Sequence, residues 1–154
     1  MKNTVLKGDE RREIMDMVSG FIDLTVTPFG REVRSVVRVD KREPMYGGEG
    51  VVYLLQLFAE DELVNNRIGC YMVLPGRGTS AGFHTHGPRK EQEIYCVVHG
   101  EGIYRDMDGA TKQVVREQEV RRGSVTSVQG PGFHSIVNTG SDPLIVFVIT
   151  TNEP

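Results

Sequence analysis

The sequence predicts an all-β protein, either a sandwich or a barrel, and three observations carry that prediction. From about residue 21 onward, apolar residues recur mostly with a period of two, which is typical of β-strands. Turn signals separate these short segments at close spacing, and the chain contains 18 glycines and 7 prolines. With 154 residues, of which 38% are hydrophobic, the chain is long enough to bury one core.

One short helix is expected before the strands begin. Asp9 is placed to cap a helix over residues 10–19, because its side chain can accept a hydrogen bond from the first turn. Gly20 then marks the end of this helix. The buried face of the helix would consist of Ile14, Met17 and Val18.

Two strands are expected next, at residues 21–27 and at residues 32–39. The second strand would place Val33, Val37 and Val39 on one face. A helix and two strands bury too little apolar surface to fold alone, so we interpret residues 1–40 as an N-terminal extension and residues 41–154 as one β-barrel domain. The extension and its valine-rich strand predict a homodimer, because an uncovered strand edge needs protection.

The remaining strands are expected to follow one another without a further domain boundary. Turn signals such as Pro75-Gly76, Asp108-Gly109 and Gly130-Pro131-Gly132 separate them. Their expected positions are residues 50–58, 67–75, 83–86, 93–98, 102–106, 112–116, 124–128, 134–138 and 144–151.

Charge and hydropathy argue against several classes of partner. The formal net charge of −3 gives no general attraction for nucleic acid or for an anionic membrane surface. The apolar run Leu144–Ile149 is too short to cross a bilayer, and acidic residues stand where a signal peptide needs an apolar core. We therefore expect a cytoplasmic protein, with Cys70 and Cys96 reduced rather than joined in a disulfide.

Histidines gather in the stretch GFHTHGPRKEQEIYCVVHGEG, residues 82–102. His84 and His86 point to one side of an expected strand, because alternate residues of a strand share a face. A hairpin at the following Gly-Pro turn would bring Glu93 alongside them, and His134 opens a later strand. Three neutral imidazoles and one carboxylate suit a borderline divalent metal ion, with positions left open for water or substrate.

These residues also carry a family resemblance. The segments GFHTH and EIYCVVHG resemble the first motif of the cupin superfamily, in which a glutamate precedes a glycine by this distance, as Glu93 precedes Gly100. Glu91 has the same strand parity but a different distance to the glycine, and the long gap after His86 leaves both glutamates open as ligands. The segment GSVTSVQGPGFHSIVN resembles the second motif, with Gly123, His134 and Asn138 in place.

The resemblance runs from about Met45 to the C-terminus and is to small single-domain bacterial cupins. It implies a double-stranded β-helix, which is a jelly-roll barrel, with a short N-terminal helical extension in this chain. It also implies one divalent metal ion (Mn, Fe, Zn or Ni) near one mouth of the barrel. The metal ligands it implies are His84, His86, Glu93 and His134.

Other side chains near the expected site have two interpretations each. Tyr95 shares the strand parity of Glu93, so its hydroxyl either acts on substrate as an acid or simply packs in the core. Glu91 is a second candidate proton carrier. His99 lies at the far end of the same strand and is expected to be structural. Arg89 and Lys90 are expected in a solvated loop rather than on an anionic substrate.

Cupins catalyse many reactions, so the fold does not imply one function. The resemblance implies a metal-dependent enzyme acting on a small oxygen-rich molecule, such as a sugar, a keto acid or a carboxylate, as an isomerase, decarboxylase or oxygenase. The alternative is a non-catalytic cupin that binds a metal or a small molecule. An apolar interior would favour the alternative, and its expected members are Tyr95, Phe133, Ile136 and Phe147.

Overall fold

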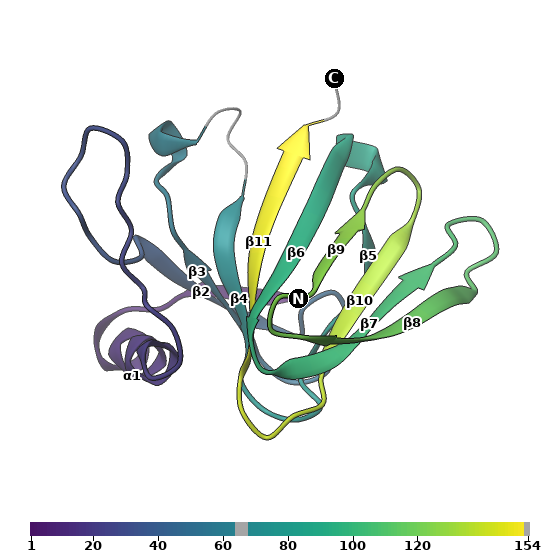
Figure 1. The fold of residues 1–154 in the computed structure, drawn as a ribbon, viewed down its shortest axis with the longest axis horizontal. Coiled ribbons are helices and arrows are strands. Elements are labelled where there is room, and N and C mark those ends of the chain that lie inside the picture. Colours follow the sequence, from purple (N-terminus) through teal and green to yellow (C-terminus); the bar gives the residue numbers. More distant parts are fainter. Residues whose placement is uncertain (64–67, 153–154) are drawn as a thin grey trace.

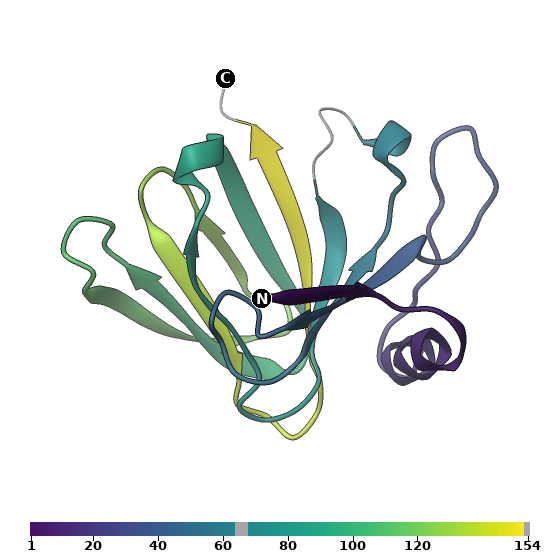
Figure 2. The same cartoon turned by 180° about the vertical axis from the view of Figure 1, so that it is seen from behind.

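The computed structural model describes residues 1–63 and 68–152, and strands dominate them (Figures 1 and 2). Besides α1 (Gly8–Ser19), two single 3-10 turns occur at Glu60–Glu62 and Gly87–Arg89. The strands are β1 (Lys2–Val5), β2 (Arg38–Glu43), β3 (Val52–Gln56), β4 (Gly69–Leu74), β5 (Ser80–Thr85), β6 (Glu91–His99), β7 (Glu101–Met107), β8 (Val114–Arg121), β9 (Val125–Val128), β10 (Phe133–Asn138) and β11 (Leu144–Asn152).

The strands form two antiparallel sheets, which confirms the all-β prediction. The larger sheet has the order β1-β2-β3-β4-β11-β6-β9, and the smaller has the order β5-β10-β7-β8. After β4 the chain crosses repeatedly between the sheets, so several neighbours, such as β4 and β11 or β5 and β10, are distant in sequence, as in a jelly roll. Figure 1 shows the two sheets opening from each other toward the upper right, where β7 and β8 spread away from β9.

The space between the sheets holds the main core. Side chains from both sheets alternate inward along their strands, which is the period-two pattern seen in the sequence. Tyr95 and Ile136 are only 2% and 1% exposed. The other members include Val52, Leu54, Cys70, Met72, Leu74, Val97, Tyr104, Val120, Leu144, Val146 and Val148.

A second core covers the outer face of the larger sheet. The N-terminal segment supplies one side of it, including Val18 of α1, and the sheet supplies Val73 and Ile145. Strands β4 and β11 are therefore buried on both faces, which explains why their sequences are nearly continuous runs of apolar residues. In Figures 1 and 2, α1 lies beside β2 and β3, away from the smaller sheet.

Helix α1 largely follows its prediction. Its buried side faces the second core, and Gly20 caps its C-terminus. The predicted cap at Asp9 is wrong, because the helix begins at Gly8 and its N-cap is Lys7, which makes no side-chain cap hydrogen bond. Asp9 instead lies in the first turn, where a negative charge interacts favourably with the helix dipole.

The two strands expected at residues 21–27 and 32–39 are also wrong. Only one isolated bridge, between Val26 and Arg34, joins these segments, and β2 begins at Arg38. The alternating residues Leu24 and Val26 are buried because they pack onto the outer face of the larger sheet, not because they pair as a strand. The division into residues 1–40 and 41–154 stays a prediction.

No helix within the described residues is long and apolar enough to cross a membrane. Cys70 and Cys96 are free, as expected from the sequence.

Candidate metal centre

The four side chains suggested by the sequence meet between the two sheets. His84 lies on β5 and His134 on β10, in the smaller sheet, whereas Glu93 lies on β6 in the larger sheet. His86 follows β5 directly. The predicted hairpin is therefore wrong, because β5 and β6 belong to different sheets. The carboxylate reaches the imidazoles across the barrel interior, and all four residues are buried.

The ligand atoms of these residues converge on one point. Glu93 Oε2 lies 2.8 Å from His86 Nε2, 3.0 Å from His134 Nε2 and 3.5 Å from His84 Nε2. The Nε2 atoms of His84 and His134 are 3.0 Å apart. One ligand atom from each of the four residues lies within 4.8 Å of every other.

The donor set fits a divalent transition metal ion. His86 Nε2 and Glu93 Oε2 are buried and have no partner of hydrogen-bonding geometry among the described residues. Buried polar atoms normally have a partner, and facing imidazole nitrogens are the arrangement that a cation satisfies. The four side chains could therefore hold a metal ion, with coordination positions left for further ligands.

Contacts behind the rings of His84 and His134 orient them toward this point. His84 Nδ1 lies 2.8 Å from the carbonyl oxygen of Gly82, to which it can donate. His134 Nδ1 lies 3.2 Å from the hydroxyl oxygen of Tyr104. A proton held at each Nδ1 leaves the Nε2 lone pair directed into the cluster, as a metal ligand requires.

A charged pair, Arg89 and Glu91, contacts Nδ1 of His86, on the side of the ring away from Glu93. His86 Nδ1 lies 3.3 Å from Glu91 Oε2 and 3.0 Å from Arg89 Nη2, and Arg89 Nε donates to Glu91 at 3.0 Å. Glu91 thus meets the opposite side of the ring from Glu93, so the geometry favours Glu93 as the ligand. Arg89 and Lys90 are exposed, as expected for a solvated loop, but the Arg89 guanidinium also contacts Glu91 and His86.

Comparisons with known proteins agree with this fold. No family model matches the sequence, and no curated protein matches it. The chain resembles the crystal structure of a predicted oxalate decarboxylase from Thermotoga maritima, with 28% identity over 73% of this chain and 90% of that one, at a TM-score of 0.62. It also resembles a cupin 2 conserved barrel domain protein from Salinispora arenicola, with 19% identity over 66% of this chain and 76% of that one, at a TM-score of 0.51.

The cupin domain of Schizosaccharomyces pombe Cnp3 shares the fold over more of the chain. It is 13% identical over 86% of this chain and 87% of that one, at a TM-score of 0.54. The chain has the cupin fold. The resemblance read from its two motifs is thereby confirmed, and so is the double-stranded β-helix.

Electrostatics within the cupin cluster favour an ionised Glu93 beside a neutral His134. Burial opposes ionisation of Glu93, but the contacts with His134, His84 and His86 outweigh it and hold the Glu93 pKa well below its usual range. Burial lowers the pKa of His134 to about 4. Burial also disfavours the charged form of His86, but Glu93 and Glu91 overcome this and raise its pKa.

The lowered pKa of His134 predicts a loss of stability on acidification of the metal-free cupin. Between pH 6.5 and about 4, the unfolded chain binds a proton at this residue that the folded chain does not. The free energy of unfolding should therefore fall with pH by up to about 1.4 kcal/mol per unit in this window. The raised pKa of His86 acts oppositely, because its contribution is lost only as pH rises above 6.5. Urea unfolding at pH 6.5, 5.5 and 4.5 measures the slope.

The variant His134→Gln is the control for this pH dependence. It removes the titrating imidazole, so its unfolding free energy should vary less steeply across the same window. A slope equal to that of the wild-type cupin would contradict the assignment to His134.

Tyrosines line the cluster on several sides, and sequence reasoning placed only one of them. Tyr95 points inward as expected, with its ring centroid 4.9 Å from that of His134. Burial and the charge of Glu93 raise the Tyr95 pKa, so its hydroxyl keeps its proton. Tyr46 stacks on His84 with ring centroids 3.9 Å apart, and no sequence pattern connects these two residues.

Tyr104 was also missed, although the sequence contained a signal for it. Residues 102–106 were predicted as a strand, so Tyr104 and Asp106 had to share a face. Their closeness to His134 follows only from the pairing of β7 with β10.

Three other expectations have clear outcomes in the cupin. Asn138 is structural, because its side chain bonds to the backbone of Leu74, Asp142 and Gly140. His99 likewise bonds to the carbonyl oxygen of Pro143. The expected apolar interior is only partly present, because Phe147 packs against the second core rather than inside the barrel.

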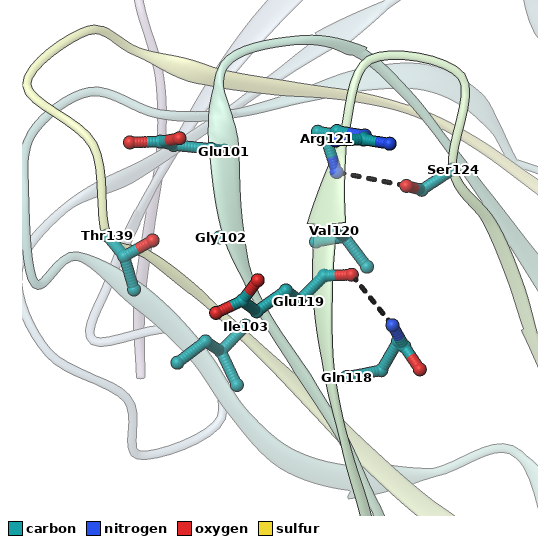
Figure 3. Close-up of a pocket in the computed structure, with 9 residues that line it drawn as sticks. All are labelled: Glu101, Gly102, Ile103, Gln118, Glu119, Val120, Arg121, Ser124 and Thr139. Atoms are coloured by element: carbon teal, nitrogen blue, oxygen red, sulfur yellow. Dashed lines mark hydrogen bonds between the residues drawn. The ribbon is translucent and has the colours of Figure 1, made fainter.

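Two cavities border the β7–β8 hairpin, and none of the four candidate metal ligands lines either of them. Figure 3 shows one cavity of about 640 Å³ beside Glu101, Ile103, Glu119 and Arg121. We therefore do not assign it to the metal centre.

Proposed function

We propose that this cupin is a metal-dependent enzyme acting on a small carboxylate. In this proposal His84, His86, Glu93 and His134 hold one divalent transition metal ion (Mn, Fe, Zn or Ni). The observation that carries the proposal is the buried convergence of three imidazole nitrogens and one carboxylate oxygen. Two of these atoms, His86 Nε2 and Glu93 Oε2, have no partner of hydrogen-bonding geometry among the described residues. A metal ion there would polarise a carboxylate or carbonyl oxygen of the substrate.

The carboxylate substrate is supported by one of the similar structures. That protein, from Thermotoga maritima, is described as a predicted oxalate decarboxylase and is 28% identical to this chain. A decarboxylase is therefore the first activity to test, before an isomerase or an oxygenase acting on a sugar or keto acid. A non-catalytic metal-binding cupin is the alternative outcome.

The chain's own residues would position the reactants and hold protons. Tyr95 keeps a protonated hydroxyl next to Glu93, so it remains a candidate acid. Glu91 contacts the back of His86 and Arg89, which supports a role in orienting His86 and keeps it as a second candidate proton carrier. Both catalytic roles stay predictions.

Elemental analysis tests the metal site directly. Protein purified without metal-affinity chromatography should contain about one transition metal ion per chain. The variant His86→Gln should lose it, whereas His99→Gln, which changes a histidine outside the cluster, should keep it. The same preparations are then assayed for carbon dioxide release from oxalate and longer carboxylates. Wild-type protein that takes up no metal overturns the proposal, and metal without any turnover favours the non-catalytic alternative.

Removing Glu91 should weaken metal binding without abolishing it. The variant Glu91→Ala takes away the acceptor on His86 Nδ1, and losing such an outer contact typically costs 10- to 100-fold in metal affinity. Titration with Mn²⁺ or Zn²⁺ measures the change. Gln92→Ala, at the adjacent position of β6, is the control and should bind metal like the wild type. Equal affinities in both variants would argue against the orienting role.

The predicted homodimer has a separate test, because nothing about the metal site requires it. Light scattering of the purified protein should give twice the mass of one chain, and a monomer mass would remove this prediction.

A further inference from the structure

A second cavity, of about 440 Å³, lies between β8 and β9, and like that of Figure 3 it is lined by none of the four candidate metal ligands. Tyr104 and Asp106 of β7 and Arg116 and Gln118 of β8 line one side of it, and residues 124–127 line the other. Gln118 lines both this cavity and the cavity of Figure 3, but neither Tyr104 nor Arg116 lines the cavity of Figure 3. Tyr104 links the second cavity to the back of the His134 ring, because its hydroxyl oxygen lies 3.2 Å from His134 Nδ1.

The register of the smaller sheet aligns a charged pair in this cavity with two candidate metal ligands. His134 on β10 lies opposite His84 on β5 and opposite Asp106 on β7, and Asp106 lies opposite Arg116 on β8. Residues directly opposite in antiparallel strands point to the same face of the sheet. These four side chains therefore form one row on the inner face. Neighbouring strands are about 4.8 Å apart, so β8 lies roughly 10 Å from β10.

The far end of this row can recognise an anion. Arg116 Nε lies 3.4 Å from Asp106 Oδ2, and the Arg116 side chain is 69% exposed. Asp106 is the only ion-pair partner of Arg116 within residues 1–63 and 68–152, so the rest of its guanidinium fork can meet a ligand. A guanidinium binds a carboxylate through two parallel hydrogen bonds. Asp106 and Gln118 offer oxygen acceptors for hydroxyl groups beside it.

We propose that this cavity binds the distal end of the substrate, with a carboxylate at Arg116 and hydroxyl groups at Asp106 and Gln118. The proximal carboxylate of the same molecule reaches the metal centre. Counted from one terminal carboxylate oxygen to the other, a dicarboxylate of four to six carbon atoms has five to seven bonds of roughly 1.5 Å, or about 7.5 to 10.5 Å in total. This length suits the separation of β8 from β10, so the substrate class is a hydroxylated dicarboxylate longer than oxalate. This inference rests on the proposed function and narrows its substrate.

Binding of acids of different length tests the inference. Calorimetric titrations of Mn²⁺-loaded protein with oxalate, L-malate and D-glucarate compare two, four and six carbon atoms. The wild type should bind malate or glucarate more tightly than oxalate. Arg116→Gln should weaken binding of the longer acid at least tenfold while leaving oxalate binding and metal content within twofold.

A matched control lies one position along the same hairpin. Arg105 pairs with Glu117 at 2.7 Å, and both belong to the opposite face of the β7–β8 ladder. Arg105→Gln should therefore leave the binding of oxalate and of the longer acids unchanged. The inference is overturned if Arg116→Gln leaves the longer acids unaffected, if it weakens oxalate equally, or if the wild type prefers oxalate. In each of these outcomes the protein still binds metal, so the proposed function stands. If the wild type binds no metal, both the proposed function and this inference are overturned.

Discussion

Adding Mn²⁺ or Zn²⁺ to the metal-free protein should raise its free energy of unfolding by about 4 kcal/mol when free metal exceeds the dissociation constant a thousandfold. The reason is that the four ligand atoms are assembled only in the folded chain, since residues 84 and 134 lie on different strands. Thermal or urea unfolding at several metal concentrations measures this shift.

The variant Glu93→Gln isolates the contribution of the carboxylate to that shift. Glutamine has nearly the same shape but no charge, and Glu93 is the residue whose oxygen approaches all three imidazoles. Its metal-induced shift should fall below about 1 kcal/mol at the same metal concentration. Ca²⁺, which prefers oxygen ligands, should stabilise neither protein. A shift in Glu93→Gln as large as in the wild type would contradict the assigned ligand.

Substituting Gly82 by alanine should destabilise the fold by about 2–3 kcal/mol, at the upper part of the range for overpacking. A Cβ at this position would lie 2.2 Å from the carbonyl oxygen of Tyr46 and 2.8 Å from the backbone nitrogen of Gly48. Backbone atoms cannot rotate away, so the loop that carries Tyr46 must move. The Tyr46 ring, which stacks on His84, should then leave the metal centre.

Gly76→Ala is the matched control for this substitution. An added Cβ there meets no atom within 4 Å, and Gly76 does not have a positive φ. Urea unfolding should distinguish the two variants clearly, and Mn²⁺ titration should show weaker binding only in Gly82→Ala. Equal stabilities would show that the loop has room to shift without cost.

The cluster of candidate metal ligands could be predicted because its pattern is local. The spacing of His84 and His86 sets their shared direction within a few residues, and Glu93 and His134 carry motif positions of their own. The strand partners could not be predicted, because pairing in a jelly roll joins segments far apart in the chain. The hairpin proposed between His86 and Glu93 failed for this reason, and so the roles of Tyr46, Tyr104 and Arg116 stayed hidden.

The N-terminal segment shows a different limit of sequence patterns. Alternation of Leu24 and Val26 looked like a strand, but these side chains contact a sheet that already has its hydrogen-bonding partners. Val33 and Val37 are 62% and 41% exposed, whereas Val39, predicted to lie on the same strand face, is fully buried. Burial by packing and burial by pairing leave the same apolar period in a sequence, so only the fold separates them.

Because β4 and β11 of the larger sheet are buried on both faces, the N-terminal segment acts as a built-in cover for them. Removing that cover would leave Leu55, Val73 and Ile145, each fully buried in the intact chain, facing water together. A contiguous apolar surface of this kind promotes aggregation. Deleting the N-terminal segment should therefore lower the solubility of the protein, although it removes no residue of the histidine cluster on the other side of the sheet.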